Sequence, residues 1–354
     1  QGQGLTSVRD SIQISATTIA AGERATLDLP MPSLYSHAPM SLPLQVIHGR
    51  RDGPCLFVSA ALHGDEINGV EIIRRLLHLP LLKKLRGTLL AVPIVNVYGF
   101  VNRSRYLPDR RDLNRSFPGS DKGSMAARLA ELFMEEIVTR SDYGIDLHTG
   151  AIHRENLPQI RANLDDPETA RIASAFHVPV LLNSDLRDGS LRQVAAERGI
   201  PILLYEAGEA LRFNERAIRA GVKGIVAVMR DIDMLPAVNR PRRPTDPLIA
   251  RASSWVRAGC RGILRITAPL GARVHKDEVI GFISDPFGQQ EHEVTSTSSG
   301  IIIGRTNLPL VNEGEGLFHI ARFESTRTAR STIEAFQADE APVDPAMEYE
   351  PPIV

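Results

Sequence analysis

The sequence predicts an α/β protein with a mixed, mostly parallel sheet flanked by helices, followed by a small all-β domain. From residue 54 onward, short apolar runs alternate with longer stretches of helical periodicity, which is typical of strands and helices layered around a sheet. Residues 249–322 are instead rich in Gly, Val and Ile with turn residues at short intervals, which predicts short strands. Between these parts, four prolines fall within residues 236–247, a composition that neither a helix nor a central strand accepts.

The elements of the first part follow from their periodicity. Residues 55–62 read as a buried strand, and Val70, Ile73 and Leu77 mark a helix over 69–79 by their spacing. A second β-rich run covers 89–97, an amphipathic helix covers 126–138, and a short strand over 143–147 ends at His148. Further units are expected at 178–183, 191–197 (helix), 200–205 (strand) and 213–229 (helix).

Three regions result from this reading. Residues 1–240 form the α/β domain, residues 241–325 form the all-β domain, and residues 326–354 form a tail. The tail is polar and acidic and ends in prolines, so we expect a surface arm or a disordered segment.

Composition excludes several classes of protein. Among 354 residues, 41 basic and 42 acidic side chains give a net charge of -1, so no overall field attracts nucleic acid or an anionic membrane. The two cysteines, Cys55 and Cys260, fall in different predicted domains, which disfavours a disulfide and favours a reducing compartment. Residues 1–20 contain neither a signal-peptide pattern nor a membrane-spanning run, and we expect a cytoplasmic protein.

The side chains of His63, Glu66 and His148 have the types and spacing of a metal site. His63 and Glu66 are three residues apart just after a predicted strand, and His148 closes a neighbouring strand. A single histidine at a strand end is more often a hydrogen-bonded surface or core residue, but the three together favour a metal. Two imidazoles and one carboxylate leave a fourth position open, which is typical of a catalytic zinc. We therefore expect one zinc ion per chain.

Two further carboxylates are candidates at the same edge. Asp146 lies two residues before His148 and either accepts the outer N–H of that imidazole or caps a loop. Glu206 follows the apolar run 202–205, so it is expected at a strand end facing the same rim. Hydrolysis of an amide needs a group that takes a proton from water and returns it to the leaving nitrogen, and Glu206 is the candidate base. The alternative for Glu206 is an exposed glutamate in a turn.

A third cluster comprises Arg105 and the run from Asp112 to Arg115. Arginine can hold a carboxylate through two parallel hydrogen bonds, an asparagine adds a donor and an acceptor, and an arginine beside zinc can stabilise an oxyanion. Five arginines crowd residues 103–115, and most of them must be solvated. Within this cluster, we select only Arg105, Asn114 and Arg115 as candidates for contact with a substrate.

Five motifs together resemble the succinylglutamate desuccinylase and aspartoacylase family, which has a zinc carboxypeptidase-like fold. They are Leu-His-Gly-Asp-Glu-Ile-Asn-Gly at 62–69, Arg-Tyr at 105–106, Asp-Leu-Asn-Arg at 112–115, Asp-Leu-His-Thr at 146–149 and Glu-Ala-Gly at 206–208. The resemblance covers residues 40–325 and implies zinc ligands His63, Glu66 and His148 with Glu206 as general base. It also implies that Asn114 and Arg115 hold a substrate carboxylate while Arg105 polarises the carbonyl. The segment between Arg105 and Asp112 is slightly longer than aspartoacylases lead us to expect, so substrate identity is not carried over.

The C-terminal domain resembles a barrel-sandwich hybrid of the biotinyl and lipoyl type, through residues 272–281 and 298–302. Residues 289–299 lack the lysine that a cofactor carrier needs, so the domain is expected to cap the zinc cleft or mediate assembly. His275, His292 and His319 are then expected to be structural or solvated.

The leading hypothesis is a zinc-dependent deacylase that cleaves the amide of a small N-acyl amino acid or related carboxylate. A zinc metallocarboxypeptidase is the alternative enzyme, although a covered cleft admits small molecules better than chains. A non-catalytic binder of acidic metabolites is the alternative of another class, and it has no use for the base Glu206. The expected partner is a small carboxylate substrate, without nucleic acid or membrane. A homo-oligomer is compatible with the sequence, which does not decide the oligomeric state or a preference for amide over ester.

Overall fold

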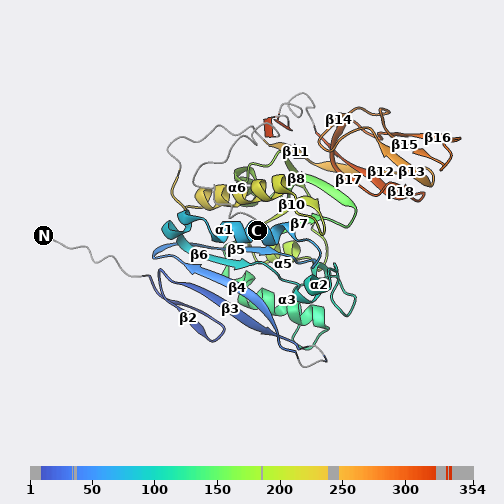
Figure 1. The fold of residues 1–354 in the computed structure, drawn as a ribbon. Coiled ribbons are helices and arrows are strands. Elements are labelled where there is room, and N and C mark those ends of the chain that lie inside the picture. Colours follow the sequence, from blue (N-terminus) through green and yellow to red (C-terminus); the bar gives the residue numbers. More distant parts are fainter. Residues whose placement is uncertain are drawn as a thin grey trace, which may run out of the picture.

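The computed structural model describes residues 9–33, 35, 38–184, 186–237, 247–323, 332–333 and 335–336. Within this part of the chain, strands form one large mixed sheet and two small antiparallel sheets, and helices cover both faces of the large sheet (Figure 1). This arrangement confirms the predicted mixed α/β sheet flanked by helices. No helix in the described part has the length and apolar character needed to cross a lipid bilayer.

The elements up to residue 150 begin with a hairpin of β1 (Ile12–Ile14) and β2 (Thr17–Ile19). There follow β3 (Arg24–Met31), β4 (Met40–His48), β5 (Arg51–Ala60), α1 (Asn68–Leu77), η1 (Pro80–Lys84), β6 (Arg86–Val92), α2 (Val97–Val101), η2 (Leu113–Arg115), α3 (Met125–Glu136), η3 (Val138–Arg140) and β7 (Tyr143–Gly150).

The elements from residue 154 to the proline-rich segment are β8 (Arg154–Ala162), α4 (Pro167–Ala175), β9 (Val180–Asn183), α5 (Leu191–Glu197), β10 (Ile202–Glu209) and α6 (Glu215–Asp231). The C-terminal part contains strands β11 (Leu248–Ala250), β12 (Ala252–Arg257), β13 (Gly262–Ile266), β14 (Arg273–Val274), β15 (Val279–Ser284), β16 (Glu291–Thr295), β17 (Gly300–Thr306), β18 (Leu310–Val311) and β19 (Gly316–Arg322).

The centre of the large sheet is parallel. Strands β10, β7, β5 and β6 lie side by side in that order and run in the same direction. Antiparallel strands continue the sheet on both sides, with β4 and β3 beyond β6, and β8 beyond β10. Because the carboxyl ends of parallel strands meet at one edge, the segments that follow β5, β7 and β10 are brought together there.

Alternating side chains on the central strands fill two hydrophobic cores. In β5, Leu56 and Val58 point into the core beneath α1 and α6, whereas Phe57 points into the core beneath α3 and α5. A strand whose two faces are both covered reads as a continuous apolar run, and this is why residues 55–62 are recognisable in the sequence. Figure 1 shows α6 and α1 on one face of the sheet and α3 on the other.

The C-terminal strands continue the large sheet. β17 pairs with β8 on one side and with β19 on the other, and β12 closes the edge. A second sheet of β16, β15, β13 and β18 packs against them around a core that includes Leu264, Ile280 and Phe318. The predicted all-β character of this part is therefore confirmed. The proposed boundary between residues 240 and 241 lies outside the described residues, as does most of the predicted tail.

Candidate metal centre and cavity

The loop between β5 and α1 carries His63 and Glu66. This loop is tightly packed, because a Cβ atom on Gly64 would lie 2.0 Å from the backbone carbon of Gly99. The backbone N–H of Glu66 donates to the carbonyl of His63 at 3.1 Å, which forms a turn that points both side chains to the same side. The predicted position of His63 just beyond a strand end is confirmed.

Replacing Gly64 with Ala should displace this loop. The added methyl group meets backbone rather than a flexible side chain, so the loop must move to accept it. We expect a loss of about 1–3 kcal/mol in the free energy of unfolding, a typical cost of overpacking. Urea unfolding of the two proteins measures the loss, and equal midpoints would contradict the packing argument. Gly259→Ala is the matched control, because no atom lies within 4 Å of the position of its added Cβ and its φ lies outside the left-handed region.

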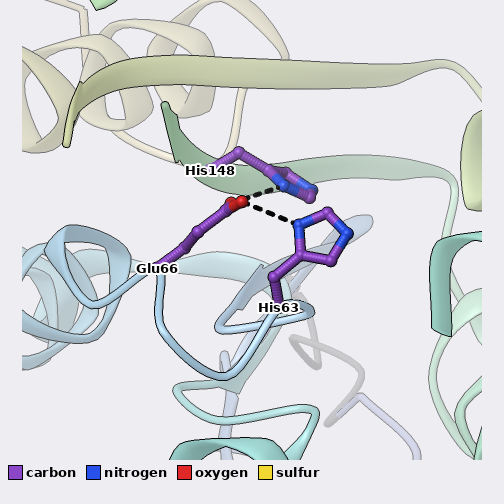
Figure 2. Close-up of side chains that lie close together, drawn as sticks. All are labelled: His63, Glu66 and His148. Carbon is purple, nitrogen blue, oxygen red and sulfur yellow. Dashed lines mark hydrogen bonds and ion pairs between the residues drawn. The ribbon is translucent and has the colours of Figure 1, made fainter. Parts of the chain in front are cut away.

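His148 lies on β7 and completes a buried cluster (Figure 2). His63 Nδ1 lies 2.8 Å from Glu66 Oε1, and His148 Nδ1 lies 2.8 Å from Glu66 Oε2. One donor atom from each of the three residues lies within 4.8 Å of the other two. All three side chains are buried. The structure thus brings together the three residues that the sequence selected as ligands.

The outer nitrogen of each imidazole is held by a carboxylate. His148 Nε2 lies 2.7 Å from Asp146 Oδ2, and the other oxygen of Asp146 accepts a hydrogen bond of 2.8 Å from Ser59 Oγ. His63 Nε2 lies 3.1 Å from Asp112 Oδ1. These contacts leave Nδ1 of both rings directed at Glu66. Of the two roles considered for Asp146, contact with His148 is the one present.

Attraction between opposite charges holds the three side chains of this cluster together. Burial disfavours charge on all three groups, but the attraction between the Glu66 carboxylate and the imidazoles outweighs it. The pKa of Glu66 therefore lies below its ordinary range, and the pKa values of His63 and His148 lie above theirs. For His148 the charge of Asp146 raises the pKa more than that of Glu66 does, and for His63 the contact with Asp112 adds to the effect of Glu66.

The donor set fits zinc. Imidazole nitrogen and carboxylate oxygen are both zinc ligands, and three protein ligands are the number found in catalytic sites. Asp146 and Asp112 occupy the positions that carboxylates take behind metal-bound histidines, where they fix the orientation of the ring.

Arg105 lies beside this cluster. Its guanidinium contacts Glu66 Oε1 at 3.2 Å and Asp112 Oδ2 at 3.1 Å. The positive charge therefore lies next to a candidate ligand and faces the cavity. A carbonyl oxygen bound near Glu66 would also be within its reach.

Glu206 is paired in register with His148 on the neighbouring parallel strand. Its carboxylate forms an ion pair with Arg161 of β8, with Oε2 2.5 Å from Nε but outside hydrogen-bond geometry. The prediction that β10 ends at Glu206 is wrong, because the strand continues to Glu209 beyond a register shift at Glu206. The alternative of an exposed glutamate in a turn is also wrong, since the side chain is 16% exposed and lines the cavity.

Asn114 and Arg115 lie on the short helix η2 and line the same cavity. The side-chain oxygen of Asn114 accepts a hydrogen bond of 3.0 Å from the backbone N–H of Leu191, which fixes its orientation. Arg115 is exposed, and its guanidinium donates to the carbonyl of Asn114.

The cavity has a volume of about 610 Å³ and contains more candidate residues than the sequence suggested. In the described part of the chain, its charged lining consists of two glutamates, Glu66 and Glu206, and seven arginines. These are Arg105, Arg115, Arg154, Arg161, Arg187, Arg192 and Arg251. Only two of these arginines were selected from the sequence. Trp255, His319 and Ser253 from the C-terminal strands also line the cavity, and the sequence offered no signal for them. His319 is buried, whereas His275 and His292 are exposed.

Comparison with known proteins identifies the family. The model of the succinylglutamate desuccinylase/aspartoacylase catalytic domain matches residues 52–232, about half of the chain. The chain belongs to the succinylglutamate desuccinylase/aspartoacylase family. The matched region contains all eight selected site residues.

The chain is also similar to a curated relative and to solved structures. N-alpha-acetyl-L-2,4-diaminobutyric acid deacetylase of Halomonas elongata is 28% identical over 301 residues, which cover 79% of this chain and 85% of the deacetylase. The product-bound structure of the ectoine utilization protein EutE (DoeB) from Ruegeria pomeroyi has a TM-score of 0.76 at 24% identity, covering 84% of this chain and 95% of that one. A succinylglutamate desuccinylase/aspartoacylase from Rhodobacter sphaeroides also has a TM-score of 0.76, at 23% identity, with 85% and 96% covered. These structures share the fold.

Proposed function

We propose that this protein is a zinc-dependent amidohydrolase that removes the acyl group from a small N-acyl amino acid. The observation that carries the proposal is the His63–Glu66–His148 cluster in the wall of a cavity that also contains Glu206. Membership of the succinylglutamate desuccinylase/aspartoacylase family supports it, as does the relative whose name records the deacetylation of N-alpha-acetyl-L-2,4-diaminobutyric acid.

His63, Glu66 and His148 would hold the zinc ion. Bound zinc supplies a Lewis acid and lowers the pKa of a water molecule toward about 7. Glu206 takes a proton from the water that attacks the amide carbonyl carbon. When the carbon–nitrogen bond breaks, Glu206 returns that proton to the leaving nitrogen, so that a carboxylic acid and an amine are released.

The arginines and Asn114 orient the substrate. Arg115 and Asn114, in the lining of the cavity, hold its carboxylate, and Arg105 stabilises the negative charge that develops on the carbonyl oxygen. A cavity with one wall from the C-terminal strands favours small substrates over the extended chains that a carboxypeptidase accepts. A protein that only binds acidic metabolites, without hydrolysing them, would not need a general base such as Glu206.

Metal analysis and a substrate screen test this proposal. We expect about one zinc per chain, and hydrolysis within a panel of N-acetyl, N-succinyl and N-formyl amino acids that includes N-alpha-acetyl-L-2,4-diaminobutyrate. Amine release from each compound is followed before and after treatment with a chelator. Absence of zinc, or turnover that survives its removal, would contradict the proposal.

Replacement of Arg115 by Ala should raise KM more than it lowers kcat. The side chain is proposed to hold a carboxylate in both the ground state and the transition state, so its loss removes uniform binding. A hydrogen bond to a charged group is worth about 1.5–3 kcal/mol, which corresponds to roughly a 10- to 150-fold rise in KM. Arg111→Ala is the matched control, because Arg111 is exposed on the same loop and lies outside the cavity lining. An unchanged KM in Arg115→Ala would assign the carboxylate to another residue.

A further inference from the structure

One wall of the cavity is built by strands from the C-terminal part of the chain. A row of paired residues crosses the large sheet from Trp255 on β12 to His319 on β19, Gly304 on β17 and Asn156 on β8. Residues paired in register place their side chains on the same face of a sheet. Trp255, His319 and Asn156 all line the cavity that contains Glu206. The C-terminal strands thus extend the wall of the cavity.

Trp255 is stacked on His319, which is itself held by Ser253. The two rings have a centroid distance of 4.8 Å and an interplanar angle of 4°. His319 Nε2 lies 2.8 Å from Ser253 Oγ. Burial, and then the charge of Arg161, lower the pKa of His319 to about 3, so this ring is neutral at physiological pH. It positions the indole without adding charge to the cavity.

The guanidinium of Arg154 lies over the Trp255 ring, 4.9 Å from its centroid. Arg154 is exposed at the cavity, and no acidic side chain in the described part of the chain forms an ion pair with it. Hydrogen bonds with Asn312 are the main cause of the lowered pKa of Glu315, and the charge of Arg154 makes only a smaller contribution to it. An arginine that is oriented by an aromatic ring keeps its N–H donors available for a planar anion such as a carboxylate.

The charge of the cavity favours such an anion. Of the seven arginines in the described lining, Arg105, Arg161 and Arg251 form ion pairs with acidic side chains, whereas Arg115 and Arg154 form none among the described residues. The carboxylate proposed to bind at Asn114 and Arg115 balances only one of the remaining positive charges. A second anionic group on the ligand would lower the repulsion among the arginines.

We propose that Arg154 and Trp255, positioned by His319 and Ser253, form a second carboxylate subsite that binds an anionic end of the substrate remote from the scissile amide. The identity of the ligand as a substrate rests on the proposed function, whereas the subsite itself does not. The C-terminal strands then determine which N-acyl amino acids are preferred. Compounds with two carboxylates bind better than compounds of the same shape with one.

Trp255 is the only tryptophan in the sequence, so intrinsic tryptophan fluorescence reports directly on this subsite. The probes are two matched pairs. N-glutaryl-L-norvaline is compared with N-pentanoyl-L-norvaline, and N-acetyl-L-glutamate with N-acetyl-L-norvaline, which places the second carboxylate on either side of the amide. Emission is recorded by stopped flow before turnover. We expect a saturable change at lower concentration for the dicarboxylate of at least one pair.

Arg154→Ala should raise the Kd of that dicarboxylate about 10-fold or more and leave the Kd of its monocarboxylate partner unchanged. Arg154→Lys keeps the charge but loses the planar fork, so an intermediate Kd is expected. The matched control is Arg265→Ala, because the guanidinium of Arg265 also lies over an aromatic ring, 4.5 Å from the ring centroid of Phe282, but outside the cavity lining. This control should bind like the wild type.

Equal affinities within both pairs, or a dicarboxylate affinity that Arg154→Ala leaves intact, would overturn the subsite. This result is distinguishable from failure of the proposed function. If the wild type hydrolyses none of the N-acyl amino acids, the proposed function is wrong, and the fluorescence titration still decides the subsite. If hydrolysis occurs and kcat/KM does not distinguish wild type from Arg154→Ala within a pair, the subsite alone is wrong.

Discussion

Glu206→Gln should retain zinc and lose hydrolysis, with kcat reduced about 10²- to 10⁴-fold, the usual contribution of a general acid or base. The amide has nearly the shape of the carboxylate but cannot accept a proton from water. Glu206 is paired in register with His148 and is not part of the metal cluster, so its replacement leaves the three candidate ligands in place. The rate constants are measured by amine release and the zinc content by elemental analysis.

The control for this variant is Glu209→Gln. Glu209 lies on the same strand, outside the described lining of the cavity, and its carboxylate contacts the backbone N–H of His153 and the side chain of Asn307. We expect kcat close to that of the wild type. Because Glu206 also neutralises Arg161, thermal unfolding of both variants is compared to separate loss of the base from loss of folding. Unchanged turnover in folded Glu206→Gln would remove Glu206 from the mechanism.

The candidate ligands could be selected from the sequence because each lies on or just after a strand of the parallel centre. His63 and Glu66 follow β5, and His148 lies near the end of β7, its neighbour in the sheet. An apolar run that ends in a polar residue identifies such a position without knowledge of the pairing. The predicted end of β10 was wrong for a related reason. Its ladder with β8 continues past Glu206, and the residues after Glu206 carry no apolar alternation.

The C-terminal wall could not be found in this way. Trp255 and His319 reach the cavity only because β17 pairs with β8, so that strands about 150 residues apart in the chain become neighbours. Pairing between distant strands depends on the whole fold, and no local pattern at residue 255 or 319 indicates it. Asp112 was missed for the same reason. Its contact with His63 joins two loops that are far apart in the chain, and no local pattern in the run 112–115 indicates it.

His63→Ala should lose the metal itself. Removal of one imidazole leaves two protein ligands, and the neighbouring Asp112 loses its contact with the ring. Loss of a partner that only orients a ligand costs about 10- to 100-fold in metal affinity, so loss of the ligand should cost more. We expect zinc to be absent after dialysis, and hydrolysis to fall to background with it.

Competition with a chromogenic chelator measures the zinc affinity of this variant against two comparisons. Asp146→Asn keeps all three candidate ligands and alters only the contact behind His148, so its affinity should lie between those of the wild type and His63→Ala. His292→Ala removes an exposed histidine of β16 and should bind zinc like the wild type. This ranking of zinc affinities distinguishes three kinds of residue: a zinc ligand, a residue that orients a ligand, and a histidine that does neither. Full zinc occupancy in His63→Ala would show that the ion is held elsewhere, and the hydrolytic mechanism assigned to this cavity would then lose its basis.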